Sequence, residues 1–440
     1  MSPILALILC LSFVLFLLRF ERRRARDVTN ALWIPLIWVL YIASKPLGTW
    51  FRSSTIIEYG SPLDRAFLIP LMLISLLILI KRKFDWRSAI RENKWLIILV
   101  CFMLVSILWS SIPYISFKRW TRELVAILMA FIVLSEASPR RAIEVIFRRM
   151  TYILIPFSIL LIKYFPIYGR MYNPFTGKET WTGVAQQKNG LGILCVIAGF
   201  SLIWSLIKRM QGNNPPFWKY QTPAELFLLA LTLYLLRGAE SASSNVALAV
   251  GMIGYLGFYL MKKKRIRMRS HALATIVTII IIIGTIAPFT SASFIGSFAG
   301  SVGRDSTLTG RTDIWNAILP FVKHRLLLGL GFGGFWTSQT TEAIQVNQSH
   351  NGYLELILAL GFVGLVLFSI FLLSSCRKAQ QNLSSDFDWG VIWACNLVMF
   401  VIHNISEASL NDLATFFATM IVFFSVSSKN GAHSEVCNPI

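Results

Sequence analysis

Charged side chains are scarce in this sequence. Only 14% of its 440 residues are Asp, Glu, Lys or Arg, whereas a soluble domain carries about a quarter. Cysteine is sparse as well, and no two of the six cysteines have the CxxC spacing of a metal or redox motif. The period-two alternation that marks membrane-spanning strands is also missing. These absences argue against a soluble domain, a disulfide framework, a cysteine metal cluster and spanning β-strands.

Hydrophobic residues make up 55% of the chain, and continuous apolar runs recur from end to end. Runs of this length predict an all-α polytopic integral membrane protein. The net charge is +21, from 42 basic and 21 acidic residues. Lysine and arginine are enriched in the cytoplasmic loops of membrane proteins. Because no aromatic and basic recognition module is present, we expect no nucleic-acid partner.

The first 26 residues are apolar and then basic. A cleaved signal peptide has the opposite order, so we interpret this segment as a retained first span. Basic clusters after every second apolar run give a consistent inside–outside alternation. The sequence therefore predicts about 12–13 transmembrane helices in a single integral membrane domain, 1–440. The expected spans are about 3–19, 31–44, 65–80, 95–110, 120–136, 150–166, 188–207, 225–237, 244–260, 272–289, 353–374, 389–404 and 411–427.

One large extracytoplasmic loop, 290–352, separates two late spans in this topology. It contains TGRTDIWNAILPFVKH, which predicts a short amphipathic helix with an apolar stripe. Pro320 within it predicts a kink or an early end. The glycine-rich stretch LGLGFGGFW follows and would let the backbone approach a ligand closely.

Several cations fall on the predicted outer face, against the general bias. One interpretation is that their side chains reach lipid headgroups. The other is that they bind an anionic partner at the outer membrane surface, since the planar guanidinium suits phosphate. A lipid-linked pyrophosphate fits both the charge and the location. These residues are Lys118, Arg119, Arg122, Arg170, Lys178, Lys188, Arg237, Arg304 and Arg311.

His350 directly precedes a long apolar helix. A helix N-terminus disfavours a positive imidazolium, and a neutral imidazole can accept a proton from an incoming hydroxyl. The alternative is that His350 only caps the helix or lies in the interface. Glu355, about one turn further, could orient the ring or be a plain interfacial residue. Near the outer end of span 389–404, a polar group could line the same cavity: His403, Asn404 and Glu407.

His350-Asn351, nine further residues and then Gly361-x-x-Gly364 resemble the H-[NSQ]-x9-G-x-x-G signature of the O-antigen ligase and polymerase superfamily. The upstream GRTDIW, which contains Arg311, and LLLGLGFGGFW resemble the shared loop region of that superfamily. Earlier pieces are similar to its ExoQ-type exopolysaccharide polymerase branch. These pieces are LWIPLIW, SPLDR, KRWTRE, IPFSILLIKYFPIYGRMYNPFTG and GVAQQKNGLG.

The resemblance implies a GT-C-like fold in the bacterial cytoplasmic membrane, with the active site facing the periplasm or exterior. It implies inverting glycosyl transfer without a metal or other cofactor. The donor would be an oligosaccharide on undecaprenyl diphosphate, and the acceptor a glycan or lipid A-core. His350 would be the base and Arg311 a diphosphate ligand. The expected substrate-binding residues are Arg304, Arg237, Lys188, Arg170, Arg119 and Glu355.

Polymerisation of exopolysaccharide or O-antigen repeat units is the favoured activity. The ligases of this superfamily carry an arginine near the equivalent of RGAESASS, where this chain has Ala242 and places Arg237 five residues earlier. That departure favours polymerase over the alternative, a ligase that transfers glycan to lipid A-core or protein. A lipid or polysaccharide transporter ranks lower, because polar residues concentrate in one outer loop.

Overall fold

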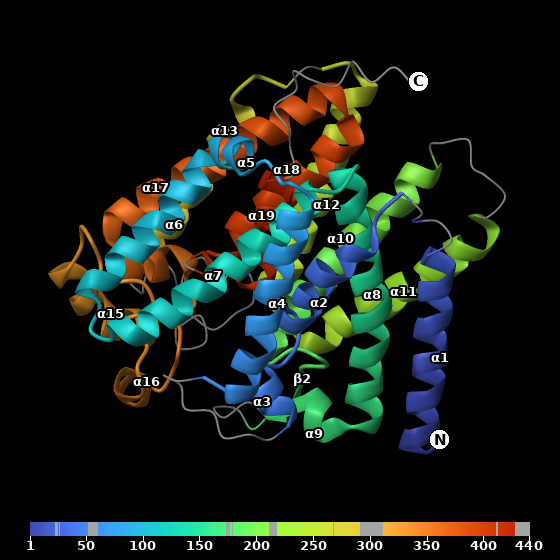
Figure 1. Cartoon of the computed structure of the whole chain (residues 1–440), viewed down its shortest axis with the longest axis horizontal. Helices are drawn as coiled ribbons and strands as arrows, with labels where there is room; N and C mark the ends of the chain where they lie inside the picture. The colour runs from blue at the N-terminus through green and yellow to red at the C-terminus, as the bar shows by residue number, and fades with distance from the viewer. Residues whose placement is uncertain are drawn as a thin grey trace.

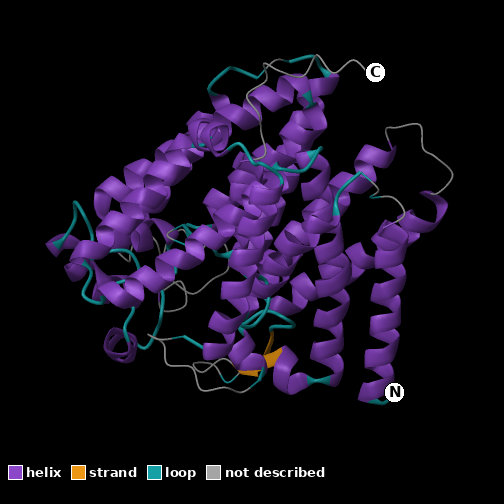
Figure 2. Cartoon of the chain, in the orientation of Figure 1, coloured by secondary structure: helices purple, strands orange, loops and turns teal. Residues whose placement is uncertain are grey.

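A computed structural model describes most of the chain. The described residues are 1–22, 25, 27–51, 60–172, 177, 179–210, 218–266, 268–290, 311–410 and 412–426. Figure 2 shows that helices dominate this structure. Among the described residues, the strands are confined to one short antiparallel hairpin, β1 (Arg170–Tyr172) and β2 (Glu179–Trp181), in which Met171 faces Thr180.

The helices of the first half begin with α1 (Pro3–Arg22), α2 (Trp33–Ile42) and α3 (Leu47–Trp50). They continue with α4 (Pro62–Lys81), α5 (Trp86–Glu92), α6 (Lys94–Ser106), α7 (Pro113–Leu134), α8 (Pro139–Tyr164) and α9 (Pro166–Gly169). The second half contains α10 (Lys188–Met210), α11 (Trp218–Ala239), α12 (Ala242–Lys263), α13 (Ala272–Ile286), α15 (Arg311–His324), α16 (Ser338–Ile344), α17 (Gly352–Ser385), α18 (Phe387–His403) and α19 (Phe416–Val426).

The all-α polytopic class predicted from the sequence is confirmed, and each of the thirteen expected spans corresponds to a helix. Within the described residues, eight helices are long and apolar enough to cross a membrane. A ninth span results if α5 and α6, which meet at a 90° bend, are one unit. Three more apolar helices have only 10–17 residues, fewer than the about 20 of a typical span. The number of full-length spans is therefore eight or nine, below the expected 12–13.

The first half of α7 is charged, which explains why this helix does not count among the full-length spans. Lys118, Arg119, Arg122 and Glu123 all lie within its first eleven positions. Its apolar second half, by contrast, is almost wholly buried in the bundle. A charged segment at the end of a helix in a membrane protein is expected to face water or protein.

The predicted topology agrees with the arrangement of the short elements. In Figure 1, α3, α9, β2 and α16 lie toward one edge of the molecule, and α5 lies toward the other. The first four belong to segments expected on the outer face, and α5 belongs to a basic segment expected inside. The helix α15 lies beside α17 on the flank that also carries α16.

The long helix α17 is broken at Gly361, whose φ is 66° and ψ −167°. Only glycine adopts this backbone conformation readily. The chain segment before Gly329 crosses the break, and its carbonyls pair with the freed amides: Phe362 N–H donates to Leu326 O (2.8 Å) and Val363 N–H to Leu327 O (3.2 Å). A Cβ on Gly361 would lie 2.2 Å from Leu327 O. The crossing thus fixes the residues after α15 against the first segment of α17.

The amphipathic helix predicted in the loop is present as α15, and its apolar stripe is buried through Trp315, Ile318 and Val322. The helix continues past Pro320 to His324, so the early end expected at that proline is wrong. Proline removes one backbone donor, but the packed stripe on both sides of Pro320 keeps the remaining turn in place. This packing positions Arg311, the first residue of α15.

Candidate functional site

The start of α17 is held by Asn351, which is the N-cap residue of the helix. Its side-chain oxygen accepts a hydrogen bond from Leu354 N–H (2.8 Å). Its amide nitrogen donates to Gly284 O (3.1 Å) in α13 and to Ile405 O (3.0 Å) after α18. One side chain therefore joins three elements, which fixes the backbone directly beside His350.

His350 itself has a left-handed backbone, with φ of 52°. Non-glycine residues adopt this region rarely, and Asn, Asp and His tolerate it best. The backbone bends here, between the loop and the N-cap, so the imidazole is carried at a turn rather than on the helix. The side chain remains 22% exposed, in contrast to the fully buried neighbours Ser349 and Asn351.

Glu355 holds the loop that carries His350. Its two oxygens accept hydrogen bonds from Ser349 N–H (2.8 Å) and from the indole N–H of Trp336. The indole of Trp315 in α15 donates to Ser349 O (2.9 Å). Glu355 was expected to bind substrate or to orient the imidazole ring, but its hydrogen bonds go to the backbone of Ser349 and to the indole of Trp336. Its observed structural role is to position the turn at residues 349–351.

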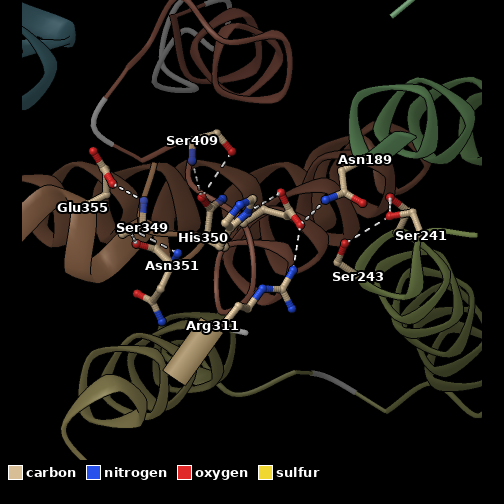
Figure 3. A network of polar contacts seen from close by, with 12 residues as sticks. Asn189, Ser241, Ser243, Arg311, Ser349, His350, Asn351, Glu355 and Ser409 are labelled. Atoms are coloured by element: carbon tan, nitrogen blue, oxygen red, sulfur yellow. Dashed lines mark hydrogen bonds and ion pairs between the residues drawn. The ribbon is translucent and has the colours of Figure 1, made fainter. Parts of the chain in front are cut away.

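A different carboxylate, that of Glu407, faces the ring. Its Oε2 lies 3.8 Å from His350 Nδ1. Its Oε1 accepts hydrogen bonds from Arg311 Nη2 (3.0 Å) and from Asn189 Nδ2 (2.6 Å). Figure 3 shows His350, Arg311 and Asn189 converging on this network from separate helices and loops. Residues from α10, α15 and the segment before α17 thus meet at one carboxylate in the loop after α18.

The loop that carries Glu407 is tied down by Asn404. The side-chain oxygen of Asn404 accepts from Ser409 N–H (2.8 Å), and its carbonyl accepts from Gly352 N–H (2.8 Å). A Cβ on Gly352 would lie 2.4 Å from Asn404 Oδ1, so the close approach of the two segments requires glycine. Because the same asparagine contacts the start of α17, the positions of Glu407 and His350 are linked.

The ionisation of Glu407 is set by opposing effects. Burial by itself raises the pKa of this carboxyl, but the contact with His350 and the nearby His403 and Arg311 together more than offset it. The pKa of Glu407 therefore lies below the ordinary value of a glutamate. At neutral pH the group is an anion between Arg311 and His350. A carboxylate beside an imidazole favours the tautomer with its proton on the facing nitrogen, which leaves Nε2 of His350 as the acceptor.

Glu407 also lines a pocket of about 310 Å³ between α2, α7, α10 and α19. Amide side chains are prominent in its wall: Gln186, Gln187, Asn189 and Gln348. Amides both donate and accept hydrogen bonds, which suits a ligand rich in hydroxyl groups. The pocket lies directly against the Glu407 cluster, which consists of Asn189, Arg311, His350 and Glu407.

Lys45 braces two walls of this pocket. Its ammonium donates to Gly183 O (3.0 Å) and Ala185 O (2.6 Å) and lies 3.3 Å from Thr182 Oγ1. Burial lowers the pKa of Lys45 to about 8. The two residues that flank Lys45 line the pocket, and so does Ala185. The hydrogen bonds of Lys45 therefore hold the segment after α2 against the segment before α10.

Two of the other expected substrate-binding cations, Arg170 and Arg119, make their contacts outside this cluster. Arg170 donates to Ile162 O (2.8 Å) and pairs with Glu179 (2.8 Å), and so holds the hairpin in place. Arg119 donates to Gly333 O and to Trp336 O (3.1 Å), beneath the glycine-rich turn. Arg237 is exposed near the end of α11. Arg304 and Lys178 lie outside the described residues.

Lys188 is the first residue of α10 and is half-buried beside two residues that line the pocket, Gln187 and Asn189. Asn189 was not recognised in the sequence, although it lies in the stretch GVAQQKNGLG that resembles the ExoQ-type branch. Its position directly after Lys188, at a helix start on the predicted outer face, was the available signal.

His403 is buried against Phe417, with ring centroids 6.0 Å apart.

Together these features define a polytopic helical membrane protein whose polar site joins an arginine, a carboxylate and a histidine at the start of a late span. Residues 227–369 match the model of a family described as O-antigen ligase, Wzy_C, whose members are membrane glycan polymerases and ligases. The resemblance predicted from the sequence is thereby confirmed. The matched segment contains Arg311, His350 and Glu355, whereas Asn189 and Glu407 lie outside it.

The chain is also similar to the exopolysaccharide production protein ExoQ of Rhizobium meliloti (strain 1021). The two are 22% identical over 310 residues, which cover 67% of this chain and 67% of that protein. This distant similarity extends beyond the family segment. At the level of the family, lipid-linked glycans are the implied substrates.

Proposed function

We propose that this protein is an inverting glycosyltransferase that polymerises exopolysaccharide or O-antigen repeat units at the outer face of the cytoplasmic membrane. It takes the growing glycan from undecaprenyl diphosphate and joins it to a hydroxyl of the next unit. The observation that carries this proposal is the convergence of His350 and Arg311 on Glu407, beside a pocket lined by amide side chains. The site contains a base, a cation and a wall suited to sugars within one region.

Arg311 is assigned to the diphosphate of the donor. A guanidinium carries five N–H donors in a fixed planar fork, and the hydrogen bond to Glu407 uses one of its terminal nitrogens. Glu407 holds the fork in one orientation. As the bond between the sugar and the diphosphate breaks, negative charge grows on the leaving oxygen, and a positioned guanidinium stabilises that charge. The same cation keeps the donor in place before the reaction.

His350 is assigned to the acceptor. With the carboxylate of Glu407 facing Nδ1, Nε2 accepts the proton of the acceptor hydroxyl as its oxygen attacks the anomeric carbon. Attack opposite the departing diphosphate inverts the anomeric centre, and no protein nucleophile is needed. The 3.8 Å separation between His350 and Glu407 exceeds a hydrogen bond, and we expect it to shorten when substrates fill the site.

A ligase is the second candidate, because the matched family carries the description O-antigen ligase. A ligase and a polymerase can share the donor site and differ in the acceptor. The relative ExoQ is named for exopolysaccharide production, and Ala242 departs from the ligase pattern near Ser241. Both features favour polymerisation here.

Surface glycan from a deletion strain separates the two activities. Single attached repeat units without long chains indicate a lost polymerase. Loss of all attached glycan, with lipid-linked polymer accumulating, indicates a lost ligase and would contradict the proposal. Complementation with wild-type protein should restore long chains. Unchanged glycan in the deletion strain would show that neither activity belongs to this protein.

A further inference from the structure

A second large hollow lies far from the Glu407 cluster. It is formed by the end of α12, the start of α13, the later part of α17 and the first residue of α18, and it encloses about 1420 Å³. Pockets for drug-sized molecules usually measure about 300–1,000 Å³, so this groove suits a larger occupant. Arg377 on its rim lies 16 residues beyond the break at Gly361, roughly 24 Å along the part of α17 that follows the break, and none of the described residues lines both this groove and the pocket at Glu407. The groove is therefore distinct from the site at His350.

The inner wall of the groove is apolar. Phe258 in α12, Ala274 and Ile279 in α13, and Leu373 in α17 contribute to it. Thr278 and Leu373 also line a second, smaller cleft of about 310 Å³, which continues along α13 and α17 to Ile286 and Phe362. The fifteen residues of α13 rise by roughly 22 Å. The apolar surface is thus longer than one leaflet of a bilayer whose hydrocarbon core is about 30 Å thick.

The rim of the groove is cationic. Lys262, Arg265 and Arg377 line it, and all three are exposed. Asp388 approaches the rim, with its Oδ1 3.9 Å from Lys262 Nζ, so the three cations outnumber this carboxylate. Lys262 and Arg265 belong to the basic run KKKRIR, which follows an apolar run. The inside–outside alternation predicted from the sequence places this run and Arg377 at the cytoplasmic surface. Figure 1 shows the start of α13 toward the edge of the molecule where α5 also lies.

We propose that this groove is a binding site for an anionic phospholipid. The headgroup phosphate lies among Lys262, Arg265 and Arg377, and the acyl chains lie along α13 and α17. The charge of the rim and the length of the apolar wall together select this occupant. A soluble anion would leave the apolar wall uncovered, and a zwitterionic lipid would leave the excess positive charge unmatched. Basic pockets between helices at the cytoplasmic side are a known type of headgroup site.

The first test measures lipid binding to the purified full-length protein by native mass spectrometry. Dioleoyl phosphatidylglycerol is compared with dioleoyl phosphatidylcholine in the same detergent. We expect preferential retention of phosphatidylglycerol, and we expect Lys262→Gln/Arg265→Gln/Arg377→Gln to weaken it at least about tenfold, since each basic residue contributes roughly fivefold near an anionic headgroup. Equal retention of both lipids by the wild-type protein would overturn the proposal.

The matched control removes three exposed basic residues that do not line the groove: Lys81→Gln/Lys83→Gln/Arg87→Gln. It lowers the net charge by the same amount, and we expect binding to be unchanged. If the control weakens binding as much as the rim variant does, the attraction is a property of the net charge, and the proposed site is wrong.

The second test addresses the apolar wall. Ala274→Trp fills the groove while leaving the rim intact, so it should reduce phosphatidylglycerol binding several-fold. Ile253→Trp, on a 70% exposed position of α12 outside the groove, is the control and should have no effect. Inorganic phosphate at millimolar concentration should not displace the lipid. Displacement by phosphate, or full binding in Ala274→Trp, would show an ion site on the rim and contradict the lipid assignment.

Discussion

The imidazole of His350 and the carboxylate of Glu407 face each other at 3.8 Å, although they come from loops at opposite ends of the segment formed by α17 and α18. Asn404 links these two loops through the backbone of Gly352. The pair therefore depends on packing between the start of α17 and the end of α18.

Replacing His350 should abolish glycosyl transfer while the protein remains folded. Asparagine tolerates the left-handed backbone at this position but cannot act as a base. We expect His350→Asn to lower the rate of transfer by about 100-fold or more, with a melting temperature close to that of the wild type. His350→Ala should lose activity equally and also lose some stability. Wild-type turnover in His350→Asn would refute the assignment of the base.

Arg311→Lys retains a positive charge beside Glu407 but cannot form two parallel hydrogen bonds to a phosphate. We expect transfer to fall by about 100-fold, while the thermal stability changes little. The measurement is the rate of polymer formation from a lipid-linked repeat unit, with Arg325→Lys on the exposed end of the loop as the control. If Arg311→Lys turns over like the wild type, the arginine only holds Glu407.

Removing the charge of Glu407 should destabilise the protein in a pH-dependent way. The pKa of this carboxyl lies below its ordinary value, which is about 4.3 in an unfolded chain. Its contribution to stability is therefore complete above that value and disappears as the pH falls through the folded-state pKa. We expect Glu407→Gln to lower stability by roughly 3 kcal/mol at pH 7, because it removes the carboxylate that pairs with the mostly buried guanidinium of Arg311.

The difference between the wild type and Glu407→Gln should shrink as the pH is lowered below about 4. Thermal unfolding in detergent, measured from pH 7 to pH 3.5, checks this. Glu342→Gln removes an exposed carboxylate of α16 and should show no such dependence. A constant difference at all pH values would mean that Glu407 is not ionised in the folded protein.

The break in α17 should require glycine. Gly361→Ala places a Cβ 2.2 Å from Leu327 O and forces alanine into a backbone conformation that it rarely adopts. We expect a loss of at least about 1–3 kcal/mol and a lower melting temperature. Gly257→Ala in α12, where a Cβ would meet nothing within 4 Å, should be neutral or slightly stabilising. Equal melting temperatures for the two variants would show that the crossing is not rigid.

The loop that carries α16 should face the outside of the cell. A cysteine at the exposed position Glu342, in a background without other cysteines, should react with a membrane-impermeant maleimide in intact cells. A cysteine at Lys264, in the basic segment after α12, should react only after the membrane is opened. The reverse pattern would overturn the proposed orientation.

The sequence was sufficient to predict the class of the fold and the order of its helices. Apolar runs report local helix formation, and all thirteen expected spans are helices in the structure. The number of full-length spans was overestimated, because residues of α2, α18 and α19 are apolar owing to burial inside the protein rather than contact with lipid. Composition alone does not distinguish these two environments.

The site was only partly predictable. Arg311 and His350 were found because they lie in one polar loop with a recognisable signature. Their common partner, Glu407, was only a weak candidate, and Asn189 was missed, because both come from other segments that meet the loop through tertiary packing. Arg170, by contrast, appeared to be available to a ligand, but it forms an ion pair with Glu179 in a hairpin that the sequence pattern did not indicate.

The crossing at Gly361 also explains why a fixed spacing matters in this part of the chain. The segment between His350 and Gly361 has a fixed length. The N-cap residue holds one end of it, and the chain segment that crosses at Gly361 holds the other. Inserting one residue would rotate the turn at His350 by about 100° and advance it by about 1.5 Å. The imidazole would then point away from Glu407 although every residue of the site were still present. An insertion or deletion in this segment should therefore disrupt the site more than most substitutions of its side chains.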